Sequence, residues 1–228
     1  MELVYSRGVE ITLEFRGPVA LITWNDGENR INLDSLGRLN DIFDELDQIE
    51  GPLAVVWTGT GKFFSNGLDL DRFADDPDQF GATATALHRL FGRVLLFPAY
   101  TVAAINGHAF AGGAMLTCTT DLRVMRADRG YWCLNEVELG LPLTDAMAAL
   151  VLGRLPKAAA REAMLTARRF DAASALAAGI VEVIVPEDDV VPYAVERAAA
   201  IAPKDRQVIK IHKYQAFADV ARRTGFLN

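Results

Sequence analysis

Apolar and polar residues alternate near the start of the chain. Residues 10–15 follow this pattern and residues 18–24 continue it after an Arg-Gly turn, so the two segments predict a β-hairpin. From Asp34 onward, apolar residues recur at helical spacing as far as Ile49, which predicts an amphipathic helix. The short apolar run at 53–57 is bounded by Gly-Pro and Thr-Gly-Thr-Gly, and it predicts a strand that is buried on both faces.

The order of strand, glycine turn and helix then recurs. A turn with Gly67 follows the first buried strand, and a helix is expected after it. Residues 101–105 are strand-like, 106–113 are rich in glycine, 114–119 predict a helix and 122–125 predict a strand. The recurrence has no fixed sequence period, so it predicts stacked ββα units and not a solenoid.

Beyond Pro142 the pattern becomes mainly helical. We predict one strand over 180–185 and helices over 144–153, 157–168, 172–178, 190–201 and 205–223. We place a boundary near residue 170. Residues 1–170 are then an α/β core and residues 171–228 a helical C-terminal region.

Composition narrows the class of protein. The 228 residues are 51% hydrophobic, which fits one folded α/β domain with or without a short appendage. The formal charge of −7 argues against nucleic acid as a partner, because a phosphate-binding surface needs a basic patch. The two cysteines, Cys118 and Cys133, form no metal-binding motif, so we expect no metal site and two reduced, buried thiols.

The stretch from Val94 to Thr120 lacks acidic and basic residues and is long enough to span a membrane. Pro98, Asn106 and three glycines interrupt it, and the backbone breaks that they cause would be costly in lipid. We therefore expect a buried strand and turn and no membrane partner. The start of the chain lacks the layout of a secretory signal, and we expect a cytoplasmic protein.

Two glycine turns offer a place for chemistry. Residues 61–70 and 106–114 each lead from a strand toward a helix, where backbone N–H groups lack partners within the helix. Glycine lets a substrate approach the main chain closely. Two such turns could converge on one oxygen atom and stabilise a negative charge that develops on it.

Other common chemistries are disfavoured. The chain has neither a Walker loop nor a Gly-x-Gly-x-x-Gly fingerprint, and it has no Gly-x-Ser-x-Gly nucleophile elbow. His88, His108 and His212 lie in segments where a structural role is expected. Carboxylates remain as bases, and Glu136 and Glu138 are the best local candidates because they lie in an apolar segment bounded by turns.

Three segments, 62–70, 104–115 and 134–141, together resemble the crotonase superfamily of enoyl-CoA hydratases and isomerases. The resemblance implies a spiral of ββα units with a helical C-terminal region, assembled as a homotrimer or a dimer of trimers. It implies an acyl-CoA thioester as substrate and no further cofactor. By position, the N–H groups of Leu68 and Gly112 would form an oxyanion hole. The residues along the substrate path would be Arg30, Ile31, Ser65, Asn66, Gly67, Gly113 and Met115.

The superfamily's hydratases use two glutamates, and Met115 stands at the position of the first. Only the second is retained, as Glu136, which is similar to the Δ3,Δ2-enoyl-CoA isomerases. A thioether orients water poorly, whereas moving a double bond needs one mobile proton. The resemblance thus implies an isomerase in which Glu136 moves a proton from C2 to C4. Two alternatives stay open: a hydratase that recruits Asp145 or Glu138, and a non-catalytic acyl-CoA-binding protein.

Overall fold

The strands form two sheets. The computed structural model describes residues 10–76 and 78–227. The larger sheet has the order β1-β2-β3-β5-β7-β9, in which β1 and β2 are antiparallel and every later pair is parallel. Its strands are β1 (Ile11–Arg16), β2 (Val19–Trp24), β3 (Ala54–Gly59), β5 (Tyr100–Ile105), β7 (Leu122–Arg126) and β9 (Val183–Val185). The smaller, parallel sheet has the order β4-β6-β8, formed by β4 (Phe63–Ser65), β6 (His108–Phe110) and β8 (Trp132–Cys133).

The helices occur in two groups along the chain. The first group alternates with strands and comprises α1 (Leu33–Asp47), α2 (Leu70–Asp75), α3 (Asp78–Leu95), α4 (Gly112–Cys118) and α5 (Glu136–Leu139). The second comprises α6 (Asp145–Arg154), α7 (Lys157–Thr166), α8 (Ala172–Ala177), the 3-10 turn Glu187–Asp189, α9 (Val190–Ile201) and α10 (Arg206–Arg223). The predicted hairpin and the predominance of helix beyond Pro142 are confirmed.

A strand of the large sheet, a strand of the small sheet and a helix follow one another three times. The units are β3-β4-α2, β5-β6-α4 and β7-β8-α5. Since equivalent strands are neighbours in each sheet, the turns that follow them gather at the same side of the molecule. The stacked ββα units predicted from the sequence are therefore present, and they bring the turn at Gly67 next to the turn at Gly112.

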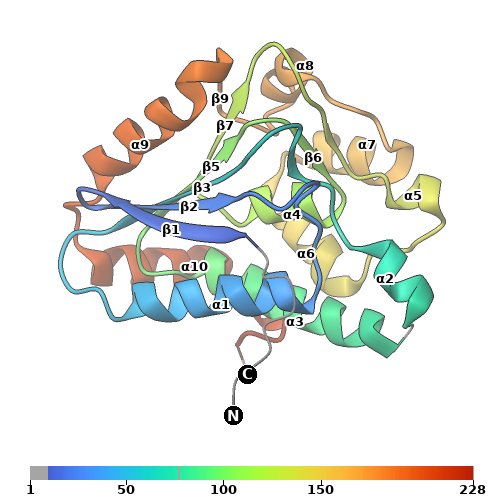
Figure 1. Cartoon of the computed structure of the whole chain (residues 1–228), viewed down its shortest axis with the longest axis horizontal. Helices are drawn as coiled ribbons and strands as arrows, with labels where there is room; N and C mark the ends of the chain where they lie inside the picture. Colours follow the sequence, from blue (N-terminus) through green and yellow to red (C-terminus); the bar gives the residue numbers. More distant parts are fainter. Residues whose placement is uncertain (1–9, 77, 228) are drawn as a thin grey trace.

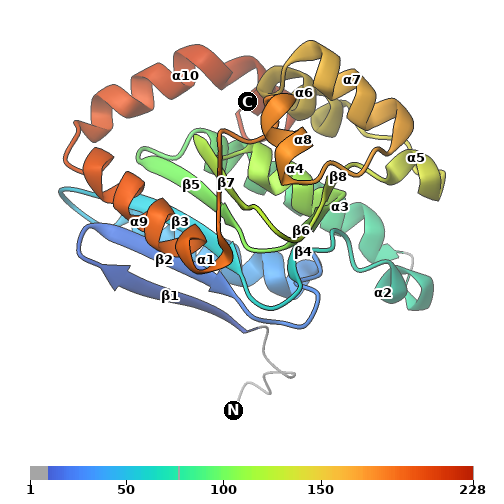
Figure 2. The ribbon, with the colours of Figure 1, turned by 90° about the horizontal axis from the view of Figure 1, so that it is seen from above.

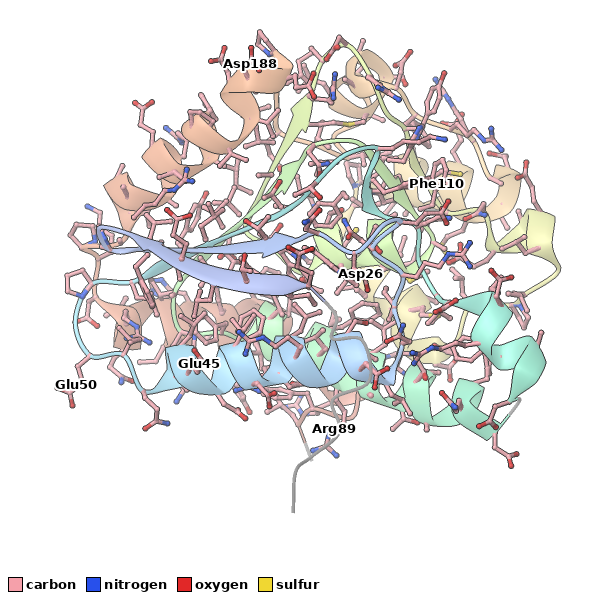
Figure 3. The ribbon with its side chains drawn as sticks, viewed as in Figure 1. Asp26, Glu45, Glu50, Arg89, Phe110 and Asp188 are labelled. Atoms are coloured by element: carbon pink, nitrogen blue, oxygen red, sulfur yellow. The ribbon has the colours of Figure 1, made fainter. Side chains whose placement is uncertain are left out.

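Helices cover both faces of the large sheet (Figures 1 and 2). On one face, α9 lies across β3 and β5, and its Val190, Ala194 and Ala198 meet Val56 and Val102 of the strands. Helices α1, α3, α4, α6 and α10 lie on the opposite side, where the larger core is buried. Charged side chains such as those of Glu45, Glu50, Arg89 and Asp188 are exposed at the periphery (Figure 3).

The segment that follows residue 170 also contributes to the sheet. Strand β9 pairs with β7 in parallel, Val124 opposite Val183, and α9 covers the strands as described above. The strand is shorter than the predicted 180–185, because Ile180 and Val181 are buried before it without joining the ladder. The boundary near residue 170 stays a prediction.

The charge-free stretch from Val94 to Thr120 forms the end of α3, strands β5 and β6, and α4, and nearly all of it is buried in the core. None of the helices in the two described ranges combines the length and apolar composition that a bilayer crossing requires. Cys118 and Cys133 are free and buried, as predicted. Burial raises the pKa of Cys133 to about 11, which keeps this thiol protonated.

Candidate active site

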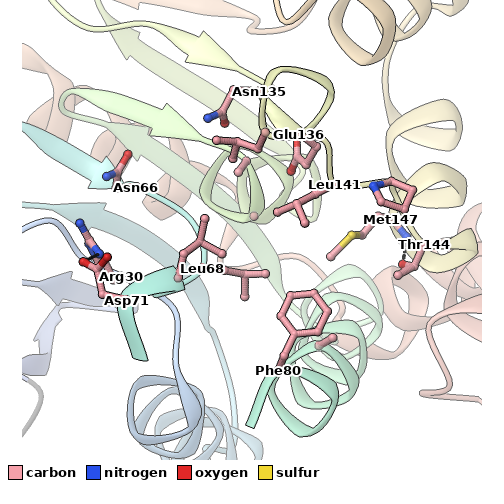
Figure 4. A pocket seen from close by; sticks show the side chains of 16 residues that line it. Arg30, Asn66, Leu68, Asp71, Phe80, Asn135, Glu136, Leu141, Thr144 and Met147 are labelled. Atoms are coloured by element: carbon pink, nitrogen blue, oxygen red, sulfur yellow. Dashed lines mark hydrogen bonds and ion pairs between the residues drawn. The ribbon is translucent and has the colours of Figure 1, made fainter. Parts of the chain in front are cut away.

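A cavity of about 270 Å³ lies where α2, α3, α5 and α6 meet the two glycine turns, and we call it the central cavity (Figure 4). Its apolar lining comprises Leu68, Leu70, Phe80, Ala84, Ala111, Gly112, Leu139, Leu141, Pro142 and Met147. Its polar lining comprises Arg30, Asn66, Asp71, Asn135, Glu136 and Thr144. An apolar cavity with a few convergent polar groups is the usual form of a small-molecule site.

The first glycine turn reaches the cavity through Leu68. Gly67 has φ +79°, and a Cβ there would come within 2.9 Å of Ala111 Cβ and 3.0 Å of the Phe110 carbonyl oxygen. The Gly67 carbonyl accepts a hydrogen bond from Ile31 N–H at 2.8 Å, which holds the turn from its other side. Glycine at 67 is thus needed both for the backbone conformation and for the close approach of the second turn.

The second turn ends in a strained residue. Ala111 has φ +49° and ψ −124°, a conformation that residues other than glycine rarely adopt and that is found most often at functional sites. It directly precedes Gly112, the first residue of α4. A Cβ on Gly113 would come within 2.7 Å of Ser65 Cβ, so Ser65 and Gly113 pack the two turns together.

Two backbone amides at the cavity lack an acceptor. Within residues 10–76 and 78–227, no loop or turn carbonyl accepts a hydrogen bond from Leu68 N–H or Gly112 N–H. Gly112 N–H also has no acceptor within α4, because the N–H groups in the first turn of a helix have no helical carbonyl before them. Both residues line the cavity. They are therefore free to donate to an oxygen of a bound molecule.

Glu136 is the first residue of α5 and lies on the wall opposite Phe80 (Figure 4). Burial raises the pKa of its carboxyl from the ordinary 4.5 to about 7, and a hydrogen bond from its own backbone amide partly opposes the shift. Its Oε2 is buried, and no group of the described chain donates a hydrogen bond to it. A carboxylate in this state is well suited to accept a proton near neutral pH.

Asn135 is a site residue that the sequence did not single out. It occupies the N-cap of α5, where Asn ordinarily accepts a hydrogen bond from the first turn, but its side chain makes no such bond. Instead its Oδ1 is buried beside the cavity, without a donor among the described residues. The signal available in the sequence was its position directly before Glu136.

Charged groups surround Arg30 and Asn66 at one end of the cavity (Figure 4). Arg30 donates hydrogen bonds to Glu28 Oε2 at 2.9 Å and to Asp71 Oδ2 at 2.6 Å. Asn66 Nδ2 donates to the same Glu28 oxygen at 2.9 Å, and these bonds lower the pKa of Glu28. The positive charge of Arg30 is therefore largely compensated by carboxylates before any anionic ligand binds.

Several residues expected on the substrate path lie behind the cavity wall. Ile31 and Ser65 are fully buried, and Ser65 Oγ donates to the Asn29 carbonyl oxygen at 2.6 Å. Gly67 and Gly113 pack the turns against each other and do not line the cavity. Met115 is fully buried in the core and does not line it either. The structure brings together Arg30, Asn66, Leu68, Gly112 and Glu136.

The segment around Glu136 is helical, and it also holds Glu138. It forms the helical turn α5, which ends at Gly140 with φ +69°. Glu138 is exposed and is absent from the cavity lining. Asp145, which starts α6, is likewise exposed and is not part of the lining. Neither alternative carboxylate therefore reaches the central cavity from its position in this structure.

The remaining lining residues come from segments whose part in the site was not predicted. Phe80 and Ala84 belong to α3, and Met147 belongs to α6. Thr144 caps α6, and its Oγ1 lies 3.0 Å from Nε2 of His88 on α3. Their contribution depends on how α3 and α6 pack around the turns, which no local motif in the sequence encodes.

The sequence model that describes enoyl-CoA hydratases and isomerases matches residues 14–225. The chain belongs to the enoyl-CoA hydratase/isomerase family. The peroxisomal enoyl-CoA delta isomerase 2 of Arabidopsis thaliana is 34% identical to it over 205 residues, which are 85% of each chain.

Solved structures of the enoyl-CoA hydratase/isomerase family share the fold. An enoyl-CoA hydratase of Mycobacterium ulcerans superimposes with a TM-score of 0.88 at 28% identity and covers 94% of both chains. The human mitochondrial delta3-delta2-enoyl-CoA isomerase gives a TM-score of 0.86 at 25% identity, over 93% of this chain and 85% of the human one. The crotonase fold and the crotonase family expected from the resemblance are confirmed. The relatives include both isomerases and hydratases. Membership in the family therefore supports an enzyme but does not distinguish isomerisation from hydration.

Proposed function

We propose that the protein is an enoyl-CoA isomerase that converts 3-enoyl-CoA into 2-enoyl-CoA. The observation that carries the proposal is the number of carboxylates that line the central cavity. There are two, and Asp71 is hydrogen-bonded to Arg30 at 2.6 Å, which leaves Glu136 as the one unpaired carboxylate of this lining. A shift of a double bond needs one base, whereas hydration needs a second group to hold and activate water.

In the proposed mechanism the thioester oxygen accepts hydrogen bonds from the N–H groups of Leu68 and Gly112. Glu136 removes a proton from C2, and the electron pair of the C2–H bond forms the C1–C2 double bond of a dienolate. The two amides stabilise the negative charge on its oxygen. Glu136 then returns the proton to C4, so the double bond moves to C2–C3 and the thioester carbonyl forms again.

This sequence of steps consumes no oxidant, reductant or metal, and we propose that the acyl-CoA thioester binds without a further cofactor. The apolar side chains of Phe80, Leu141 and Met147 would contact the acyl chain. Arg30 and Asn66 would lie beside the CoA moiety, where Asn66 can still offer its amide oxygen. The trimeric assembly and the cytoplasmic location stay predictions.

The pH dependence of the reaction tests the role of Glu136. With a pKa of about 7, the carboxyl is protonated at lower pH and cannot accept the C2 proton. We therefore expect kcat/KM for a 3-enoyl-CoA to rise about tenfold per pH unit below this value and to level off above it. A profile that is flat across neutral pH, or that falls as the pH rises, would contradict the proposal, provided that circular dichroism shows a folded protein throughout.

A further inference from the structure

Ala111 holds a backbone conformation that suits glycine. Its φ of +49° and ψ of −124° are close to the angles at the first central position of a type II′ turn, where glycine is the usual residue. Among residues 10–76 and 78–227, Asn29 and Ala167 are the other residues besides glycine that have a positive φ. Asparagine tolerates such angles, but the Cβ of an alanine strains the backbone there. The methyl group of Ala111 therefore lowers stability.

Hydrogen bonds on both sides keep Ala111 in this conformation. Its N–H donates to the Cys133 carbonyl oxygen of β8 at 2.9 Å, and its carbonyl oxygen accepts from Met115 N–H of α4 at 3.0 Å. Because a trans peptide is planar, its C=O and N–H point in opposite directions. The Ala111 carbonyl points along α4, so the N–H of Gly112 points away from this helix. The site thus requires this backbone conformation, but it does not require a methyl group on it.

The methyl group lies beside both amides of the proposed oxyanion hole. Ala111 lines the central cavity and directly precedes Gly112. A Cβ added to Gly67 would come within 2.9 Å of the Ala111 Cβ, so the methyl group also packs against the residue that precedes Leu68. In the proposed mechanism the two amides hold the thioester oxygen. The methyl group then lies next to the carbonyl carbon, C1.

The room beside C1 decides which substituents the site accepts. C1 is bonded to sulfur and to C2, and of these two atoms only C2 can carry a further group. We propose that the methyl group of Ala111 fills this room and makes the enzyme select thioesters that are unbranched at C2. Ala111 is then a specificity-determining residue, and this inference rests on the proposed isomerase function. Glycine at this position would release the strain and lose the selection.

The test compares 3-hexenoyl-CoA with 2-methyl-3-hexenoyl-CoA, which can react by the same steps because its C2 keeps one hydrogen. In the wild type, kcat/KM should be lower for the branched substrate by about tenfold or more, the usual effect of one additional methyl group in a closely packed site. Ala111→Gly should raise the ratio of branched to unbranched kcat/KM by about tenfold. The same variant should unfold at a temperature about 2–4 °C higher, because the strain is released.

Ala167→Gly is the matched control. Ala167 has φ +50° at the C-cap of α7, is 3% exposed and does not line the central cavity. Glycine there releases the same kind of backbone strain, so the unfolding temperature should also rise. The ratio of the two kcat/KM values should stay within about twofold of the wild-type ratio, because the space beside C1 is unaltered.

The inference is overturned if the wild type converts both substrates equally well, or if Ala111→Gly leaves the ratio unchanged. An equal change of the ratio in Ala167→Gly would overturn it too, since released strain alone would then be the cause. If the wild type converts neither substrate, the proposed isomerase function fails separately. Calorimetric binding of hexanoyl-CoA and 2-methylhexanoyl-CoA then decides about Ala111. Its replacement by Gly should raise the relative affinity for the branched thioester, and an unchanged relative affinity would contradict the inference.

Discussion

Replacement of Glu136 by Gln is expected to lower kcat for a 3-enoyl-CoA by about 10²–10⁴-fold, the usual contribution of a positioned acid or base. Gln has nearly the same shape but cannot accept the C2 proton. The amides of Leu68 and Gly112 remain in place, so KM should change little. Steady-state rates from the absorbance of the conjugated product measure both parameters. A variant with unchanged kcat would show that another group removes the proton.

A measurement of the stability of the same variant tests whether unfolding causes the loss of kcat. Because burial raises the pKa of Glu136 from 4.5 to about 7, the folded protein binds this proton more tightly than the unfolded chain does. Ionisation of the buried carboxyl therefore lowers the free energy of unfolding. This cost is absent at a pH below 4.5 and is fully present at a pH above about 7. Gln avoids this cost, so above neutral pH the variant should gain at most about 3 kcal/mol in the free energy of unfolding. Urea unfolding at acid and alkaline pH measures the difference, which should vanish in acid.

Gly67→Ala is expected to lower kcat/KM by about 10²–10³-fold, the usual effect of losing one oxyanion donor. The new Cβ would lie 2.9 Å from Ala111 Cβ and 3.0 Å from the Phe110 carbonyl oxygen. Real Cβ atoms do not approach neighbours so closely, so the two turns must separate. In the proposed oxyanion hole, the N–H groups of Leu68 and Gly112 would then no longer converge on one oxygen.

Gly61→Ala is the matched control. Gly61 has φ +62°, and a Cβ there meets nothing within 4 Å. Both substitutions strain a left-handed backbone and should cost stability on the order of 1–3 kcal/mol. Only Gly67→Ala should also reduce activity at a temperature where both proteins are folded. Equal activities of the two variants would show that the spacing of the turns does not matter for the reaction.

The order of the elements was readable because local patterns determine it. The alternation at 10–15 and 18–24 and the helical spacing beyond Pro142 each reflect contacts within a short segment. The stretch 106–113 was expected to be only a turn, but it also contains strand β6 and the first residues of α4. Recurrence of strand and glycine turn also predicted that two turns would meet, and the packing of Gly67 against Ala111 fulfils that prediction. Glu136 could be identified because it is an acidic residue within an apolar segment that is bounded by turns.

Other features depend on contacts between distant segments. Ser65 and Met115 were expected on the substrate path, but both side chains are fully buried, because β4 and α4 are covered by other elements along their whole length. Phe80 and Met147 reach the central cavity only because α3 and α6 pack around it. The ion pair of Arg30 with Asp71 likewise joins the segment before α1 to α2, and no local pattern in the sequence predicts it.

In the proposed reaction, one carboxylate moves a proton and no second group delivers water. Its most direct test is to incubate the purified protein separately with 3-hexenoyl-CoA and with 2-hexenoyl-CoA and to follow the absorbance of the conjugated thioester. We predict a steady rise with the first substrate and a nearly constant signal with the second. If the absorbance falls with 2-hexenoyl-CoA faster than it rises with 3-hexenoyl-CoA, the protein is a hydratase and the proposed reaction is wrong. No change with either, while acyl-CoA still binds, would identify a non-catalytic binding protein.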